Sequence, residues 1–131
     1  MRLLLDSHVF LWWRQGSRRL SHEARRAIAA PTSVVMVSAA SVWEIAIKAA
    51  IGKLTWKPVT GHDIDDSIVA AGFTELPVTA RHAAAVRHLA PHHGDPFDRL
   101  LIAQAFADGL RIVTADEVFE HYGVPILAAG A

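Results

Sequence analysis

Short apolar segments along the chain predict the strands of a buried sheet. They carry apolar residues in succession, without the polar residue at every second position that a half-exposed strand shows. The predicted strands are residues 3–5, 34–37, 111–114 and 124–127. Residues 73–78 are predicted to form a further short strand at the edge of the sheet, because Pro77 has no amide hydrogen to donate to a central ladder.

Helical patterns occupy the intervals between these strands. The predicted helices are residues 9–13, 22–30, 39–51, 61–72, 79–89 and 96–108, with a short one after Asp116. Ser21, Ser38 and Asp95 are suitable N-caps for three of them, and Gly52 is a suitable stop. Strands that alternate with helices predict an α/β fold with one parallel sheet, and we expect a single domain over residues 1–131.

Acidic residues fall close to the carboxyl ends of the predicted strands. Asp6 directly follows the first strand, and Asp116 lies two residues beyond the strand that ends at Thr114. Glu44 is in the second turn of the helix after residues 34–37, and Asp98 is in the first turn of its own helix. Because ligand crevices of open α/β sheets lie beyond the carboxyl ends of the strands, these four carboxylates are expected to converge.

Each acid taken alone also has a purely structural explanation. Asp6 is compatible with an ordinary turn, and Asp116 with an N-cap. Glu44 is one helical turn before Lys48 and can form a surface ion pair with it. The two aspartates of residues 95–98 can simply stabilise the start of a helix. These alternatives remain open for the individual residues.

The apolar surroundings of two of the acids favour a bound cation. Glu44 lies within the apolar residues 42–47, and Asp98 precedes the apolar residues 100–102. Carboxylates at the edge of buried elements are costly unless they are paired, hydrogen-bonded or bound to a cation. Oxygen ligands without thiolates suit Mg²⁺ or Mn²⁺, which can activate water and neutralise a leaving oxygen in phosphodiester hydrolysis.

Composition and charge exclude several other classes of protein. The chain has no cysteine, which excludes disulfides, thiolate metal sites and cysteine nucleophiles and agrees with a cytoplasmic location. No stretch approaches the roughly 18 apolar residues that cross a bilayer, so no membrane association is expected. The formal net charge is +0, but Lys and Arg predominate in residues 1–60 and acids in residues 61–131, which hints at a charged partner.

Four segments together resemble the PIN-domain proteins, specifically the VapC-type toxins of type II toxin–antitoxin systems. They follow one another in the order of that family and extend over residues 3 to 119. The segments are LLLDSHVFLWW (3–13), VSAASVWEIAIKAAIGKL (37–54), DPFDRLLIAQA (95–105) and IVTADEVF (112–119).

The resemblance implies a PIN-like three-layer α/β/α fold with a central parallel sheet of four or five strands. It also implies a Mg²⁺- or Mn²⁺-dependent endoribonuclease that acts as a toxin and hydrolyses RNA by metal-activated water. Its expected partners are RNA, a cognate antitoxin and a second copy of the chain, in a homodimer or a larger toxin–antitoxin complex. Carried over by position, the catalytic and metal-binding acids are Asp6, Glu44, Asp98 and Asp116. The supporting residues are Ser7 and Thr114, with Asp95 as a cap and outer-shell residue.

Basic and histidine-rich segments supply candidates for RNA contacts. These are Arg14, Arg18 and Arg19 in the densest basic region, and His92 and His93 just before Asp95. A solvated helix face explains the arginines equally well. A metal site made by His88 and His92 is disfavoured, because Pro91 between them breaks the helical spacing.

Two other functions compete with the nuclease. One is a non-catalytic RNA-binding or regulatory PIN module, in which the acids hold metal only structurally. The other is a receiver-like phosphoacceptor domain, which requires an aspartate after a middle strand. The strand at residues 34–37 ends in Ser38 instead, which makes this last reading poor.

Overall fold

The computed structural model describes residues 1–57 and 61–131, and its centre is a five-stranded sheet. All four strand pairings are parallel, and the spatial order is β3-β2-β1-β4-β5. The strands are β1 (Arg2–Leu5), β2 (Val34–Ser38), β3 (Thr74–Leu76), β4 (Arg111–Thr114) and β5 (Ile126–Ala128). The sheet confirms the predicted α/β fold, and β3 lies at the edge as Pro77 indicated.

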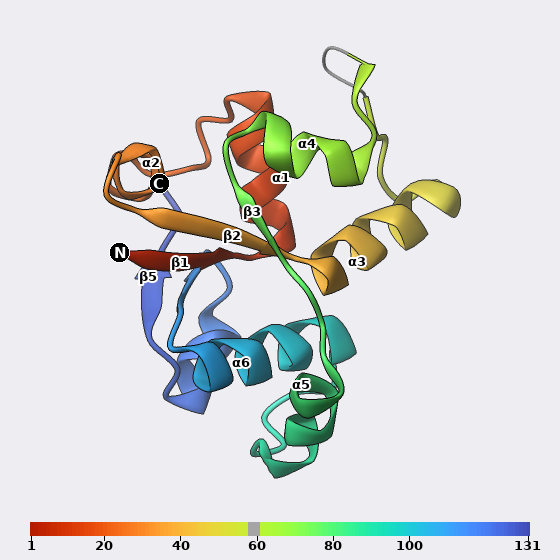
Figure 1. Ribbon diagram of the computed structural model, residues 1–131, viewed down its shortest axis with the longest axis vertical. Coiled ribbons are helices and arrows are strands. Elements are labelled where there is room, and N and C mark those ends of the chain that lie inside the picture. Colours follow the sequence, from red (N-terminus) through yellow and green to blue (C-terminus); the bar gives the residue numbers. More distant parts are fainter. Residues whose placement is uncertain (58–60) are drawn as a thin grey trace.

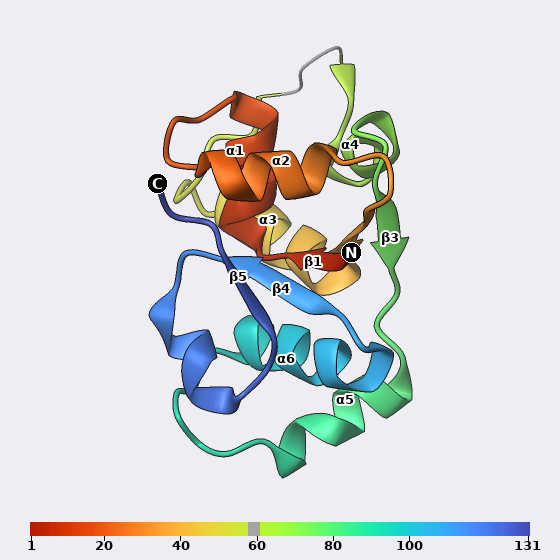
Figure 2. The same ribbon diagram turned by 90° about the vertical axis from the view of Figure 1, so that its left-hand side faces the viewer.

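Helices follow the strands along the chain. The α-helices are α1 (Ser7–Gln15), α2 (His22–Ala29), α3 (Ala39–Ala50), α4 (Ile64–Ala70), α5 (Ala80–Ala85) and α6 (Pro96–Asp108). Two 3₁₀ helices, η2 (Val86–His88) and η3 (Glu117–Tyr122), complete the described elements. Figures 1 and 2 show α1, α2 and α4 on one side of the sheet and α5 and α6 on the other.

Two hydrophobic cores cover the two faces of the sheet. Successive strand residues point to opposite faces, so Leu3 and Leu5 enter the core with α1 and α2, while Leu4 enters the core with α6. All three leucine side chains are fully buried. This arrangement explains why the strands are continuously apolar, and it is the three-layer architecture that the resemblance implied.

Several predicted boundaries were wrong for local reasons. The helix predicted at 9–13 begins at Ser7, because the side chain of Asp6 accepts a hydrogen bond from the Ser7 amide at 2.7 Å. The helix predicted at 61–72 is confined to α4, and the one predicted at 79–89 is divided into α5 and η2. The last strand begins after Pro125, whose carbonyl accepts the Ile112 amide at 2.9 Å.

A buried glutamine ties α6 to the carboxyl ends of two strands. The Ser38 hydroxyl at the end of β2 donates to Gln104 Oε1 at 2.6 Å, and Gln104 Nε2 donates to the carbonyl of Pro77 at 3.2 Å. Gln104 is fully buried, whereas Phe106, which has helical spacing with the apolar positions of α6, is 49% exposed. These bonds hold α6 beside the strand ends where the acids were predicted to converge.

Candidate active site

Asp6 occupies the point where β1 turns into α1. Its side chain is buried, and Oδ1 accepts the Ser7 amide while Oδ2 accepts the Thr114 hydroxyl at 2.8 Å. Nε2 of His8 accepts the Ala115 amide at 3.2 Å, so Nδ1 carries the proton, and Nδ1 lies 3.2 Å from Asp6 Oδ2. The Thr114 hydroxyl, the His8 ring and the Ser7 backbone amide therefore fix the orientation of this carboxylate.

Glu44 reaches the same region from α3. Its carboxylate is buried and accepts the Ser7 hydroxyl on Oε1 at 2.6 Å and the Lys48 ammonium on Oε2 at 2.8 Å. The ion pair with Lys48 is the structural alternative considered for this glutamate, and it coexists with the position predicted for a site residue. The hydrogen bond to Glu44 raises the pKa of Lys48.

Asp98 and Asp95 have different surroundings at the start of α6. Asp95 Oδ1 accepts the amides of Phe97 and Asp98, at 2.9 and 3.1 Å, which confirms Asp95 as the N-cap. The Asp98 side chain is buried, and its Oδ2 lies 3.1 Å from Nε2 of His93. Burial, together with the negative charges of Asp6, Asp95 and Glu44, raises the pKa of Asp98 to about 7.

Asp116 lies at the exposed rim of this region. It is the N-cap of η3, where Oδ1 accepts the Val118 amide at 3.1 Å, and its own amide donates to the Thr114 hydroxyl at 3.1 Å. Since the same hydroxyl donates to Asp6, Thr114 connects two of the acids predicted for the site. Asp116 therefore combines the N-cap role with proximity to the buried carboxylates.

One cavity of about 370 Å³ brings the predicted acids together, within the range of small-ligand sites. Asp6, Glu44, Asp98 and Asp116 all line it, as do Ser7 and Asp95, whereas Thr114 lies behind Asp6. The cavity has further polar residues that sequence reasoning did not assign to the site: His8, Lys48 and Lys53. Spacing gave a signal for His8, two residues after Asp6, and for Lys48, but none for Lys53.

The electrostatics of the cavity are those of clustered, poorly solvated carboxylates. Burial raises the pKa of Asp6, and the opposing effects of His8, Thr114 and Ser7 only partly offset it. The pKa of Asp98 is raised as well, so both acids are less easily ionised than an ordinary aspartate. Among residues 1–57 and 61–131, no group of three or more His, Asp or Glu side chains is placed to hold a metal ion as it stands.

The RNA-contact candidates lie outside the residues that line this cavity. Arg14 stacks on Trp56, with its guanidinium carbon 3.8 Å from the ring centroid, and burial lowers its pKa. His92 packs edge-on against the Tyr122 ring, and both ring nitrogens of His93 are bonded within the protein. The RNA contacts themselves, including those of Arg18 and Arg19, stay predictions.

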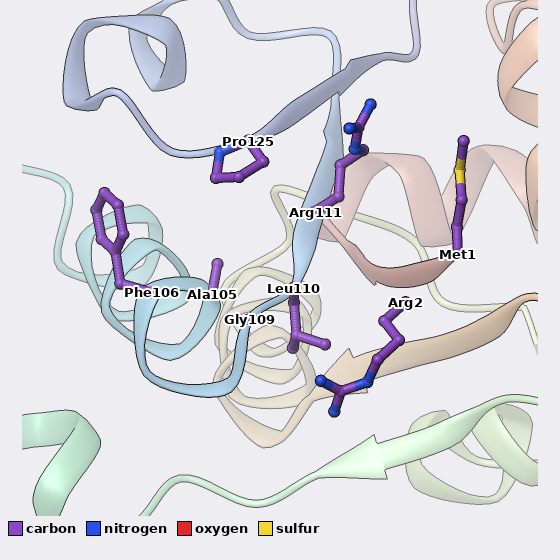
Figure 3. A pocket seen from close by; sticks show the side chains of 8 residues that line it. All are labelled: Met1, Arg2, Ala105, Phe106, Gly109, Leu110, Arg111 and Pro125. Atoms are coloured by element: carbon purple, nitrogen blue, oxygen red, sulfur yellow. The ribbon is translucent and has the colours of Figure 1, made fainter.

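A second hollow, of about 470 Å³, lies at the opposite end of the sheet, where the strands begin (Figure 3). Apolar side chains such as Phe106 and Leu110 line it together with Arg2 and Arg111. The Arg2 guanidinium already donates to the carbonyl of Asp108 at the end of α6, at 2.7 Å. With no acid in its lining, this hollow lacks the chemistry of the first cavity.

The parallel order β3-β2-β1-β4-β5, with acids gathered beyond the carboxyl ends, defines an α/β protein of the PIN-like class. The chain matches the PIN domain over residues 3–125 and belongs to the PIN-domain family. A particular relative is Ribonuclease VapC22 of Mycobacterium tuberculosis, 36% identical over 130 residues that cover 94% of this chain and 93% of the relative. This match confirms the resemblance to VapC-type proteins.

Solved structures with the same fold come from toxin–antitoxin systems. VapBC2 from Rickettsia felis, bound to a promoter DNA fragment, matches with a TM-score of 0.70 and 14% identity over 98% of both chains. VapBC-5 from Mycobacterium tuberculosis matches with a TM-score of 0.59 and 19% identity over 96% of this chain and 97% of the other. At these identities the matches show a shared fold.

No helix within the described parts of the chain is both long and apolar enough to span a membrane. The predicted cytoplasmic location stays a prediction.

Proposed function

We propose that this chain is a Mg²⁺- or Mn²⁺-dependent endoribonuclease, the toxin of a toxin–antitoxin pair, and that residues 1–131 form one nuclease domain. The observation that carries the proposal is the single cavity lined by Asp6, Glu44, Asp98 and Asp116. The similarity to Ribonuclease VapC22, which extends over 94% of the chain, supports RNA as the substrate.

The donor set of the cavity fits a hard divalent cation. Its buried acids offer carboxylate oxygens, which Mg²⁺ and Mn²⁺ prefer. Burial, and after it the neighbouring acids, raises the pKa of Asp98, and a bound cation would offset both effects. Asp6, Glu44, Asp98 and Asp116 would hold the cation, with waters completing its shell. When bound, the cation would supply the activation of water and the charge neutralisation that phosphodiester hydrolysis needs.

The protein's own residues perform the remaining tasks in this proposal. Thr114, Ser7 and His8 hold the carboxylates of Asp6 and Glu44 in fixed orientations, so the site needs little rearrangement to act. Lys48 keeps Glu44 paired when no other cation is present. Lys53, on the cavity wall, is suited to an RNA phosphate.

The direct test is cleavage of single-stranded RNA by the purified chain. We expect cleavage with millimolar Mg²⁺ or Mn²⁺ and none in EDTA, followed by recovery when the metal is restored. Binding of RNA without cleavage under all these conditions would contradict the proposal and favour a non-catalytic RNA-binding or regulatory module.

The toxin role requires a separate experiment in a bacterial cell. Induced alone, the chain is expected to stop growth, and growth should resume when the cognate antitoxin is co-expressed. Unimpaired growth, with the full-length chain detected in the cells, would contradict the toxin role. Relatives of this fold were solved as members of toxin–antitoxin systems, which supports a cognate antitoxin as a partner. A homodimer or a larger toxin–antitoxin complex is part of the same proposal.

Millimolar Mn²⁺ or Mg²⁺ is expected to raise the melting temperature by several degrees. A cation relieves the repulsion among the carboxylates, and a ligand present at about 100 times its Kd stabilises the folded state by about 2.7 kcal/mol. Differential scanning fluorimetry in EDTA and in metal measures the shift. The same shift in Asp98→Asn would show that the metal binds elsewhere.

A further inference from the structure

The segment before α6 is hydrogen-bonded to Asp98, and the proposed function gives these hydrogen bonds no role. His93 lies five residues before Asp98, and its ring is 19% exposed. Tyr122, at the end of η3, lies against it: the Tyr122 hydroxyl is 2.6 Å from His93 Nδ1, and His93 Nε2 is 3.1 Å from Asp98 Oδ2. The side chains of Tyr122, His93 and Asp98 therefore form one hydrogen-bonded network.

The proton positions in this network follow from the other hydrogen bonds of the Tyr122 hydroxyl. The Tyr122 hydroxyl accepts from the Arg99 guanidinium at 3.1 Å and from the backbone amide of His93 at 3.3 Å. These two donors occupy both of its lone pairs, so its own hydrogen points to His93 Nδ1. Nδ1 then accepts, the ring proton resides on Nε2, and Nε2–H donates to Asp98.

Arg99 holds the surrounding segment in place. Besides Tyr122, its guanidinium donates to the carbonyls of Ala90 at 2.9 Å, Val86 at 3.3 Å and Leu89 at 3.4 Å. These bonds attach the residues before α6 to the helix. His93 is thus presented to Asp98 by a braced segment.

The bond from His93 leaves the other oxygen of Asp98 available. Oδ1 has no hydrogen-bond donor among the residues that the structure describes, and Asp98 lines the acidic cavity. Oriented groups that hydrogen-bond a ligating side chain are known to fix its direction and to influence metal affinity.

We propose that His93 is a positioning residue for Asp98, and that Tyr122 fixes the ring tautomer in which Nε2–H donates to this carboxylate. The inference rests on the proposed function, since it takes Oδ1 of Asp98 to be a ligand of the proposed cation. η3 would then serve the site at both ends, with Asp116 as its N-cap and Tyr122 as its last residue.

The tautomer is tested on the metal-free protein by long-range ¹H–¹⁵N NMR of labelled histidines at pH 8. Wild type is expected to show the Nε2–H form of His93, and Tyr122→Phe a loss of that form. Exposed His22 serves as the reference, assigned with His22→Gln. An Nδ1–H form of His93 in wild type, or the same spectrum in Tyr122→Phe, would overturn the proposal.

Mn²⁺ affinity by calorimetry and kcat/KM for RNA test the positioning. We expect His93→Leu to weaken Mn²⁺ binding and kcat/KM by about 10-fold or more, because outer-shell partners of metal ligands have effects of this size. His93→Gln should retain most of both, since an amide N–H can replace Nε2–H. Tyr122→Phe should lower Mn²⁺ affinity and kcat/KM when His93 is present, and should change them little in the His93→Gln background.

The possible failures of these measurements are distinguishable. Wild-type protein that neither binds Mn²⁺ nor cleaves RNA would overturn the proposed function, and this inference with it. If wild type binds Mn²⁺ and cleaves RNA, two results would overturn the inference alone. One is that His93→Leu has the Mn²⁺ affinity and kcat/KM of wild type, and the other is that His93→Leu and His93→Gln lose them equally. The control His22→Gln is expected to match wild type in every measurement.

Discussion

Asp6→Asn and Asp98→Asn are each expected to lose at least about 100-fold in RNA cleavage. Both side chains are buried and line the acidic cavity, so each amide removes a negative charge where the proposed cation binds. Loss of an outer-shell partner alone costs 10- to 100-fold in metal affinity or activity, and loss of a ligand should cost at least the upper end of that range. Initial rates with saturating Mn²⁺ measure the effect.

The asparagine substitutions are chosen because they preserve the local structure. Asparagine is as good an N-cap as aspartate, so the Asp6→Asn side chain can still accept the Ser7 amide at the start of α1. Asp66→Asn, an exposed change in α4, is the matched control and should cleave like wild type. Cleavage by Asp6→Asn and Asp98→Asn at the wild-type rate would refute the carboxylate mechanism.

Asp98→Asn should also stabilise the metal-free protein, and increasingly so as the pH rises. Folding raises the pKa of Asp98 from 3.8 to about 7, so the folded state holds a proton that the unfolded state releases. The stability associated with this proton is complete below pH 4 and is lost as the pH rises to about 7. Asparagine cannot ionise and avoids the loss.

The expected size of this effect follows from the pKa of Asp98. Each unit of pKa difference corresponds to about 1.4 kcal/mol, and solvent at the cavity mouth screens part of the interaction. We therefore expect the stability difference between Asp98→Asn and wild type to grow by about 2 kcal/mol from pH 5 to pH 8. Urea unfolding in EDTA measures it.

Two further conditions sharpen this stability measurement. The control Asp66→Asn should show no comparable change with pH, because its side chain is exposed at the start of α4. Saturating Mn²⁺ should reduce the advantage of Asp98→Asn, since the cation compensates the charge that asparagine removes. A difference independent of pH would show that Asp98 ionises normally in the folded protein.

Local sequence patterns determined most of the architecture. Continuous apolar runs such as residues 34–37 predict strands covered on both faces, and the structure has β2 there. Asp95, followed by Pro96, predicts the start of α6, because both the cap bond and the proline depend only on neighbouring residues. These signals are local, so they could be recognised without knowledge of the packing.

The burial and the contacts of each acid depended on the tertiary structure. Asp6 and Asp116 each follow a strand, yet Asp6 is buried in contact with Thr114 and His8, whereas Asp116 lies at the exposed rim. Glu44 and Asp98 each had an ordinary structural explanation, and only the packing of α3 and α6 against the sheet brings both into the cavity of Asp6.

The sequence by itself therefore determined the α/β class, the parallel sheet and the acids to examine. Only the tertiary structure decided their contacts: Thr114 on Asp6 is 108 positions away along the chain, and Tyr122 is 29 positions from His93. Such pairs have no local spacing to reveal them. They form because parallel strands place their carboxyl ends at one edge of the sheet, where distant segments meet.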